Sequence, residues 1–149
     1  GDPMSNKKSV FPVLLIIVLL AMSLPSIISL IRGPAPMPDV FSDGYTLAQA
    51  REVSSETGKP IFALATANWC GPCQSLKRGA LQDPEVIAMI SEYSVPVYLE
   101  DGENRDEIKR LGLRGYPTSF IIEGDQVVAA LPGGDNYKQF LQQELVPVQ

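Results

Sequence analysis

The sequence predicts an α/β protein in which one apolar N-terminal helix precedes a single domain with a central mixed β-sheet flanked by helices. Three observations support this fold class. An uncharged, apolar stretch covers residues 10–31. Beyond it, short apolar runs alternate with amphipathic stretches bounded by glycine or proline, which is the pattern of strands alternating with helices. The remaining chain of about 110 residues has the size of one domain and contains no internal repeat.

Residues 10–31 are expected to form a transmembrane anchor. Their 22 positions hold no charge, and at about 1.5 Å per residue such a helix reaches about 33 Å, enough to cross a hydrocarbon core of about 30 Å. Pro12 and Pro25 are both tolerated in membrane helices. A cleaved signal peptide is the alternative, but its apolar core usually has about 7–15 residues and ends at a small-residue cleavage site. Apolar residues here continue to Ile31, so we favour the anchor.

The flanks of this stretch predict its orientation. Lys7 and Lys8 precede it and Arg32 follows it, so the positive-inside rule places residues 1–9 in the cytoplasm and the domain on the other side of the membrane. The first three residues, before Met4, resemble a remnant of expression cloning.

Residues 32–42 are expected to be a proline-rich linker. Prolines at positions 34, 36 and 38 exclude a helix and favour a stiff, extended spacer at about 3.1 Å per residue. The folded domain would then occupy residues 43–149. A spacer of this kind suits a partner that is itself at the membrane.

Turn residues and periodicity predict the elements of the domain in order. A helix ends at Gly58, and a short apolar run then follows as a buried strand. Asp83 and Pro84 suit the N-cap and the first position of another helix. Gly124-Asp125 turns the chain within a β-hairpin. The full expectation is helices at 46–57, 72–80, 83–90, 104–111 and 135–145, and strands at 61–67, 95–100, 118–123 and 126–130.

The charge balance excludes one class of partner. Nine of the 12 Lys and Arg residues and 16 of the 17 Asp and Glu residues follow Arg32, which gives that segment a net charge of −7. An acidic domain is a poor partner for nucleic acid and for anionic lipid surfaces. A solvated acidic surface is the simplest explanation.

The only two cysteines of the chain, Cys70 and Cys73, enclose Gly71-Pro72 and follow Trp69. Thiol exchange is the favoured function, because Cys70 would lie where the N–H groups of a helix N-terminus favour a thiolate. A structural zinc site needs about four nitrogen or sulfur ligands, and the chain has no histidine and no third cysteine. A purely structural disulfide would close a short loop and remove little chain entropy from the unfolded state. We expect no metal and no cofactor beyond the redox-active disulfide.

Two motifs together resemble the thioredoxin superfamily. One is the apolar run 61–68 followed by Trp69-Cys70-Gly71-Pro72-Cys73, and the other is Gly115-Tyr116-Pro117-Thr118 about forty residues later. The resemblance covers residues 43–145 and implies the thioredoxin fold, with Cys70 as the attacking thiolate and Cys73 as the resolving thiol. It also implies that Pro117 is a cis-proline facing the cysteines. Trp69, Tyr116 and Pro117 would form the groove that docks protein thiols and disulfides, although Trp69 is equally explained by ordinary packing.

Shorter stretches, at 58–61 and 81–87, resemble the thioredoxin-like domains of bacterial thiol:disulfide interchange proteins of the DsbD type. This resemblance implies a bacterial protein with its catalytic domain in the periplasm. Together with the one expected anchor, it predicts a single-pass inner-membrane protein that works with a membrane-bound electron donor. Gly71-Pro72 resembles reducing thioredoxins and favours reduction of protein disulfides. The alternative is a tethered binding or chaperone module whose cysteines rarely react. We expect a monomer.

One position departs from the resemblance. Thioredoxins usually carry a buried aspartate six residues before the first cysteine, and Leu64 stands there in this chain. The usual proton-transfer partner of Cys73 is therefore missing. Glu100 and Asp101, at the end of a predicted strand, are the candidate replacements, and strand-end surface acids are the alternative that we favour.

Overall fold

The structure is a computed structural model that describes residues 9–148, so the expected cytoplasmic N-terminus up to Lys8 lies outside the described residues. The chain divides into two compact units, residues 1–33 and 34–149. The helices are α1 (Val10–Arg32), α2 (Leu47–Thr57), α3 (Gly71–Arg78), α4 (Pro84–Tyr93), α5 (Asp101–Arg110) and α6 (Tyr137–Glu144). The strands are β1 (Ile61–Thr66), β2 (Val95–Glu100), β3 (Thr118–Glu123) and β4 (Gln126–Pro132), and two 3₁₀ helices are η1 (Asp39–Phe41) and η2 (Ala80–Gln82).

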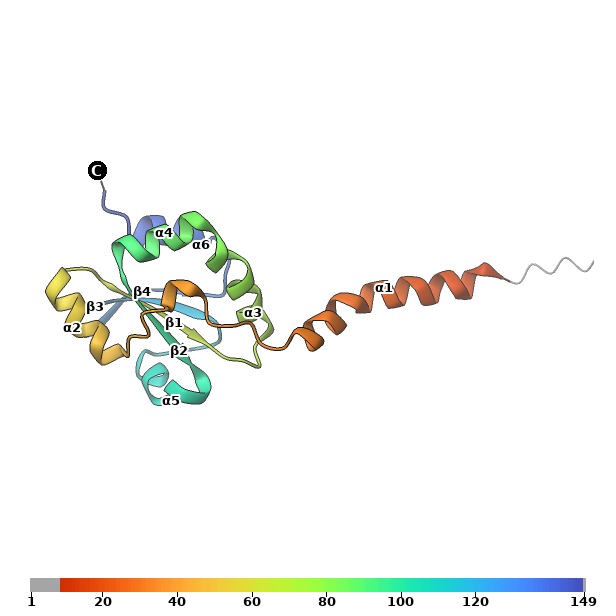
Figure 1. The fold of residues 1–149 in the computed structure, drawn as a ribbon, viewed down its shortest axis with the longest axis horizontal. Coiled ribbons are helices and arrows are strands. Elements are labelled where there is room, and N and C mark those ends of the chain that lie inside the picture. The colour runs from red at the N-terminus through yellow and green to blue at the C-terminus, as the bar shows by residue number, and fades with distance from the viewer. Residues whose placement is uncertain (1–8, 149) are drawn as a thin grey trace, which may run out of the picture. The chain divides into compact units, whose positions relative to one another are not determined.

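The second unit is built on a four-stranded mixed sheet with the strand order β2-β1-β3-β4 (Figure 1). Strand β1 runs parallel to β2 and antiparallel to β3, and β3 forms a hairpin with β4. All six residues of β1 are buried, as expected for a central strand covered on both faces. The mixed sheet of the predicted fold class is confirmed.

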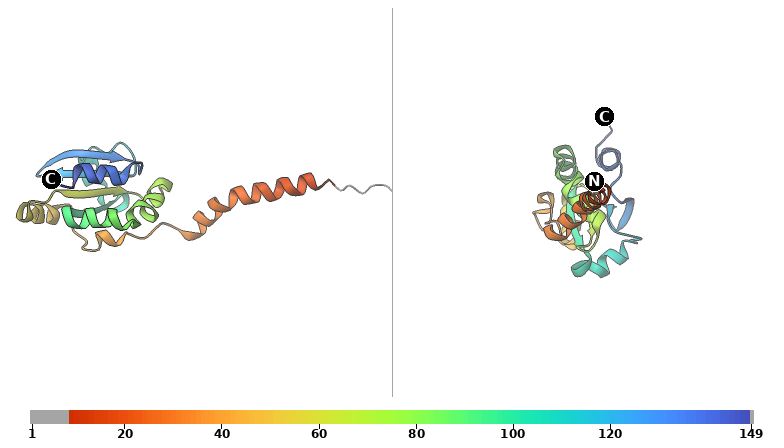
Figure 2. Two further views of the ribbon diagram at one scale, coloured as in Figure 1. Left: turned by 90° about the horizontal axis from the view of Figure 1, so that it is seen from above. Right: turned by 90° about the vertical axis from the view of Figure 1, so that its right-hand side faces the viewer.

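Helices cover both faces of the sheet. Alternate side chains of β1 point to opposite sides, so Phe62 and Leu64 join a core with α3, α4 and α6, whereas Ala63 and Ala65 join a second core with α2 and α5. Figure 1 shows these two sets of helices on either side of the strands, and α4 and α6 lie side by side in the further views of Figure 2.

Local signals account for the helix ends. Thr46 and Gln49 form a capping box at the start of α2, and Gly58 ends that helix in the left-handed conformation with φ 74°. Asp83 caps α4 by accepting a hydrogen bond from the N–H of Glu85 at 2.8 Å. The predicted caps at Asp83 and Gly58 are thus confirmed.

Several element boundaries differ from the prediction, three of them with a local cause. Helix α5 starts at Asp101, three residues early, because the Glu100 carboxylate caps it by accepting from the N–H of Gly102 at 2.6 Å. Strand β4 extends to Pro132 in its pairing with β3. Helix α6 is shorter than predicted and begins after Asn136, whose φ of 55° is left-handed.

The segment expected to be a stiff, extended spacer is packed on the domain from Ala35 onward. Ala35, Val40 and Phe41 are buried. The Phe41 ring stacks on that of Phe62 at 6.1 Å and contacts that of Tyr98 at 5.5 Å. The prolines do exclude an α-helix before Asp39, but the apolar pair after them inserts into the core, because burying a phenylalanine side chain contributes about 1.5–3 kcal/mol.

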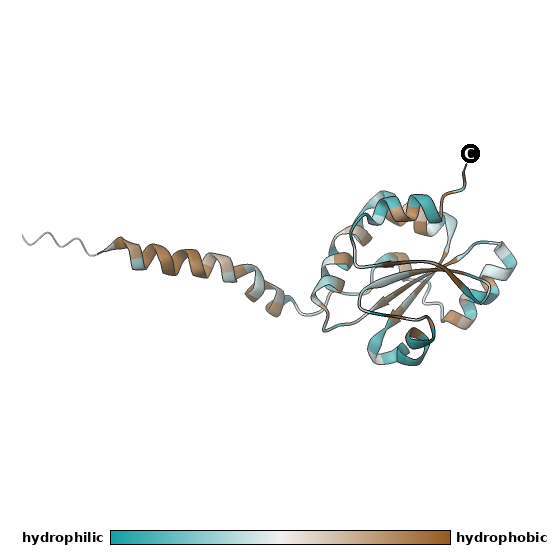
Figure 3. Cartoon of the chain, turned by 180° about the vertical axis from the view of Figure 1, so that it is seen from behind, coloured by the Kyte–Doolittle hydropathy of each residue, from teal (hydrophilic) through white to brown (hydrophobic). Residues whose placement is uncertain are grey.

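In the first unit, the ribbon of helix α1 is coloured mostly as hydrophobic (Figure 3), and the exposed large apolar residues of this unit lie along it. Its 23 residues include Pro25 within the helix. It is the one helix among residues 9–148 that is long and apolar enough to cross a membrane, by length and composition. A signal sequence near an N-terminus has the same properties.

Candidate active site

Cys70 and Cys73 lie at the N-terminus of α3, directly after the loop that leaves β1. They form a disulfide with their Cα atoms 5.3 Å apart. Cys70 is the N-cap of α3, since its sulfur accepts a hydrogen bond from the N–H of Cys73 at 3.2 Å. Cys70 is 5% exposed and Cys73 is fully buried. In the reduced state, the helix N-terminus would favour a thiolate at Cys70, the more accessible of the two.

The second motif meets the first in space. The peptide bond between Tyr116 and Pro117 is cis, as the resemblance implied. Tyr116 packs against the small cluster formed by Ala67, Cys70 and Cys73. Segments that are more than forty residues apart in the sequence therefore border the same disulfide.

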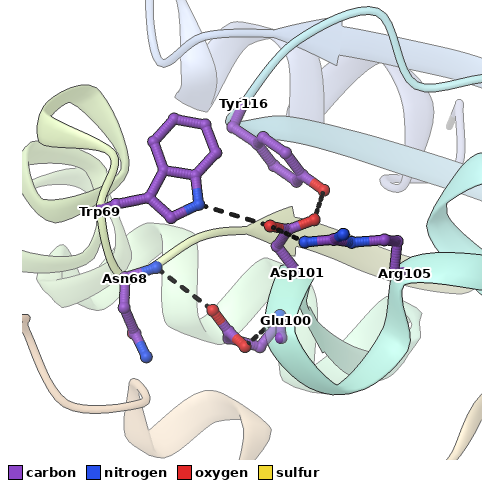
Figure 4. Close-up of polar contacts among 7 residues, drawn as sticks. Asn68, Trp69, Glu100, Asp101, Arg105 and Tyr116 are labelled. Atoms are coloured by element: carbon purple, nitrogen blue, oxygen red, sulfur yellow. Dashed lines mark hydrogen bonds and ion pairs between the residues drawn. The ribbon is translucent and has the colours of Figure 1, made fainter.

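A single carboxylate connects the two motifs (Figure 4). Asp101 accepts a hydrogen bond from the Tyr116 hydroxyl at 2.7 Å and another from Trp69 Nε1 at 3.3 Å. Arg105, one turn further along α5, pairs with the same carboxylate at 3.3 Å. The Trp69 and Tyr116 rings meet edge to face with their centroids 5.6 Å apart, a favourable aromatic geometry. Trp69 nevertheless remains 72% exposed, so it is available to a partner.

Glu100 also contacts the loop before the cysteines. One carboxylate oxygen accepts from the N–H of Asn68 at 3.2 Å, and the other accepts from the N–H of Gly102 (Figure 4). Glu100 and Asp101 are therefore not merely strand-end surface acids, because both fasten the loop that carries Trp69 and Cys70.

The hydrogen bonds of Asp101 determine its acidity. The Tyr116 hydroxyl is the largest influence and lowers the pKa of the Asp101 carboxyl, with further contributions from Trp69 and Arg105. Burial and the same hydrogen bond raise the pKa of Tyr116 to about 12. Asp101 is thus an ionised acceptor at neutral pH and a weak proton acceptor for a thiol.

Two functional candidates in this region were missed from the sequence. Gln74 is 8% exposed; its amide accepts from the N–H of Ala35 and donates to the carbonyls of Ala67 and Asn68, both at 3.2 Å. It thereby joins the start of the domain to the active-site loop. No local pattern predicts a contact across 39 residues.

The other is Lys77, which is 1% exposed although it is charged. Its spacing of four residues from Cys73 was the available signal, because residues four apart share one face of a helix. Leu64, at the position where an acid was expected, is fully buried in the core. Within residues 9–148, no group of three or more metal-binding side chains is assembled.

The chain is similar to thioredoxins and to a thiol:disulfide interchange protein. It is 31% identical over 100 residues to the chloroplastic thioredoxin F-type of Brassica napus, covering 59% of this chain and 52% of the relative. It is 31% identical over 84 residues to a thioredoxin of Chlorobaculum thiosulfatiphilum, with coverages of 52% and 72%. Against the thiol:disulfide interchange protein DsbD of Ralstonia nicotianae, it is 26% identical over 98 residues, with coverages of 62% and 16%. The chain thus spans about half the length of the plant thioredoxin it matches.

Solved structures support the same fold. A DsbH oxidoreductase superposes with a TM-score of 0.60 at 20% identity, covering 67% of this chain and 81% of that chain. A thioredoxin from Thermus thermophilus gives a TM-score of 0.58 at 20% identity, with coverages of 66% and 81%.

The thioredoxin-like family model matches residues 43–124. This range is more than half of the 149 residues and contains the cysteine pair, the acids at the end of β2 and the cis-proline. The protein therefore belongs to the thioredoxin-like family.

Proposed function

We propose that this protein is a membrane-anchored thiol:disulfide oxidoreductase that reduces disulfides of other proteins through Cys70 and Cys73. The observation that carries the proposal is the Cys70–Cys73 disulfide at the N-terminus of α3, next to the residue that precedes the cis-proline. The sequence Gly71-Pro72 between the cysteines supports the reductive direction.

The reaction has two exchange steps. In the reduced protein the Cys70 thiolate attacks one sulfur of the partner's disulfide, and the other sulfur leaves with the electron pair and takes up a proton. The Cys73 thiol then loses its proton and attacks Cys70 Sγ, which releases the remaining partner sulfur as a thiolate that takes up a proton. The partner gains two electrons and two protons, while Cys70 and Cys73 become a disulfide. A dithiol donor must reduce them again, and we place that donor at the membrane.

The groove for the partner is formed by Trp69, Tyr116 and Pro117. Trp69 is exposed beside Tyr116, and the backbone before a cis-proline can pair with an extended substrate segment by strand addition. We expect the protein to act as a monomer.

Helix α1 is the proposed anchor, in the bacterial inner membrane with the domain in the periplasm. Its length and composition support the anchor, and the similarity to a thiol:disulfide interchange protein of Ralstonia nicotianae supports this location. Lys7 and Lys8 support the orientation by the positive-inside rule.

A reduction assay tests the activity. The full-length protein in detergent, with dithiothreitol as the electron source, should accelerate the reduction of insulin disulfides. Cys70→Ser should abolish the acceleration. A protein that binds insulin chains but leaves their disulfides intact would instead be a tethered binding module.

A further inference from the structure

Lys77 is a buried cation in the layer between α3 and the sheet. Its side chain is 1% exposed, and its Nζ donates a hydrogen bond to the Tyr98 hydroxyl on β2 at 3.1 Å. The same Nζ lies 5.7 Å from the centroid of the Tyr98 ring, within the range of a cation–π contact. A buried ammonium is costly, and a neutral phenol compensates only part of that cost. The position of Lys77 therefore calls for an explanation beyond packing.

Lys77 lies one helical turn beyond Cys73. The two residues share a face of α3, and both are buried. Tyr98, which accepts the hydrogen bond from Lys77, is the Cα partner of Leu64 in the parallel pairing of β2 with β1. Lys77 thus contacts the strand residue directly beside the position where an acid was expected.

The charged and titratable groups around Lys77 are few. Burial is the largest influence and lowers the pKa of the Lys77 ammonium; Glu100 on β2 opposes that shift, and Arg78 on α3 adds to it. Asp39 borders the same surface hollow as Lys77. Burial also raises the pKa of the Tyr98 hydroxyl, which therefore stays neutral. Glu100 is thus the group that favours the charged form of Lys77.

We propose that Lys77 is a positioning residue for thiol exchange, whose buried ammonium stabilises the Cys73 thiolate when this cysteine resolves the mixed disulfide. The proposal rests on the proposed function, in which Cys70 attacks first and Cys73 resolves. A nearby cation favours the ionised form of a thiol, and it does so strongly where water is excluded. Lys77 would thereby promote, through its charge, the ionisation that a buried acid promotes in thioredoxins by accepting the proton.

The step balances without any further reactant. The Cys73 thiol gives its proton to water, and the thiolate attacks Cys70 Sγ. The Cys70–Cys73 bond forms while the bond between Cys70 and the partner's sulfur breaks. The partner's sulfur leaves with the electron pair and takes a proton from water. Lys77 stays protonated throughout.

Stopped-flow mixing of the reduced full-length protein with equimolar dithiobis(nitrobenzoate) separates the two steps. Attack by Cys70 releases the first thionitrobenzoate, and resolution by Cys73 releases the second. In Lys77→Met, the pH midpoint of the second phase should rise by about one unit, and the phase should slow by up to about tenfold near neutral pH. The first phase should change less, because Cys70 lies a turn further from Lys77.

Lys109→Met is the matched control, because it removes the same charge from an exposed position on α5; it should leave both phases unchanged. The proposal would be overturned if Lys77→Met folds and its second-phase pH midpoint equals that of the parent. A shift of that midpoint no larger than the shift in Lys109→Met would overturn it as well.

If Lys77→Met does not fold, Tyr98→Phe is the deciding variant, since it removes the hydrogen-bond acceptor of Lys77 Nζ and keeps the ring. Its second-phase midpoint should also rise, by less than one unit, and an unchanged midpoint would overturn the proposal.

Failure of the proposed function has a different signature. A parent protein without a fast first phase, or a first phase that persists unchanged in Cys70→Ser, would contradict the assignment of Cys70 itself. Either result is seen in the parent protein and in Cys70→Ser, so it is recognised without the Lys77 variants.

Discussion

The Tyr116 hydroxyl lies 2.7 Å from Asp101 Oδ1, and Asp101 Oδ2 lies 3.3 Å from Trp69 Nε1. One carboxylate thereby joins the residue before the cysteine pair to the residue before the cis-proline. The three side chains come from separate segments: the loop after β1, the start of α5 and the loop before β3. Asp101 thus stabilises the proposed docking groove through these two hydrogen bonds, and a bound partner need not contact Asp101 itself.

Tyr116→Phe tests this stabilising role of Asp101. It keeps the ring contact with Trp69 but removes the largest cause of the low pKa of Asp101, so that pKa should rise toward its ordinary value of 3.8. Trp69 is the only tryptophan, and its fluorescence at acid pH should report the shift. Loss of this hydrogen bond should slow insulin reduction by about fivefold, because Trp69 and Tyr116 are then held less firmly in the proposed groove. Tyr93→Phe is the control, and an identical fluorescence midpoint in both variants would show that Tyr116 does not set the acidity of Asp101.

Gln74→Ala should loosen the active-site loop and the start of the domain together. The substitution leaves buried backbone groups at Ala35 and Ala67 without their amide partner, which should cost about 1–3 kcal/mol in urea unfolding. Amide hydrogen exchange at Ala35 should accelerate. Gln142→Ala, at an exposed position of α6, serves as the control. Unchanged exchange at Ala35 in Gln74→Ala would mean that packing alone holds this segment.

The ion pairs of Lys138 predict a dependence of stability on pH. Lys138 Nζ lies 3.1 Å from Asp83 Oδ2 and 3.1 Å from Glu85 Oε2, and the hydrogen bond from Lys138 is the largest cause of the lowered pKa of Asp83. A depressed folded pKa contributes stability that is fully present above the ordinary value of 3.8 and is lost as the pH falls through the lower folded value.

Thermal melting therefore should distinguish Lys138→Met from the control Lys59→Met. The Lys138 variant should melt below the parent at neutral pH, and the difference should shrink at about pH 2 and in high salt. If the difference in melting temperature between Lys138→Met and the parent does not change with pH, the effect of Lys138 comes from packing and not from its ion pairs.

The membrane anchor predicts the behaviour of the full-length protein in a bacterial host. It should stay in the membrane fraction after a carbonate wash, because a span of this length does not leave the bilayer at high pH. In spheroplasts, external protease should digest the domain. Release of a shorter soluble form would show a cleaved signal, and protection of the domain would show the opposite orientation.

Much of the fold could be predicted from local patterns. The runs at 95–100 and 118–123 became strands with the predicted bounds, since a buried strand needs only a short apolar run between turn residues. The helix-end signals at Gly58 and Asp83 were equally local. Burial of the segment around Phe41 was not predictable in this way, because it depends on the distant rings of Phe62 and Tyr98.

The candidate site also has a part that local patterns predict and a part that depends on distant contacts. The cysteine pair and the cis-proline are contiguous motifs and could be recognised. The roles of Glu100 and Asp101 as acceptors for the active-site loop arise from contacts across 32 residues. Helix spacing alone places Lys77 on the same face of α3 as Cys73. Only the packing of α3 on the sheet shows that the Lys77 ammonium is buried against Tyr98.

Trapping of the mixed disulfide tests the central claim most directly. The reduced full-length Cys73→Ser and Cys70→Ser proteins would each be incubated with a peptide containing one disulfide, quenched with acid and analysed by intact mass and peptide mapping. Cys73→Ser should accumulate a one-to-one adduct joined through Cys70, because the resolving thiol is absent. Cys70→Ser should form little adduct, because Cys73 is fully buried. Equal or faster adduct formation through Cys73 would contradict the central claim that Cys70 is the attacking thiolate and Cys73 the resolving thiol.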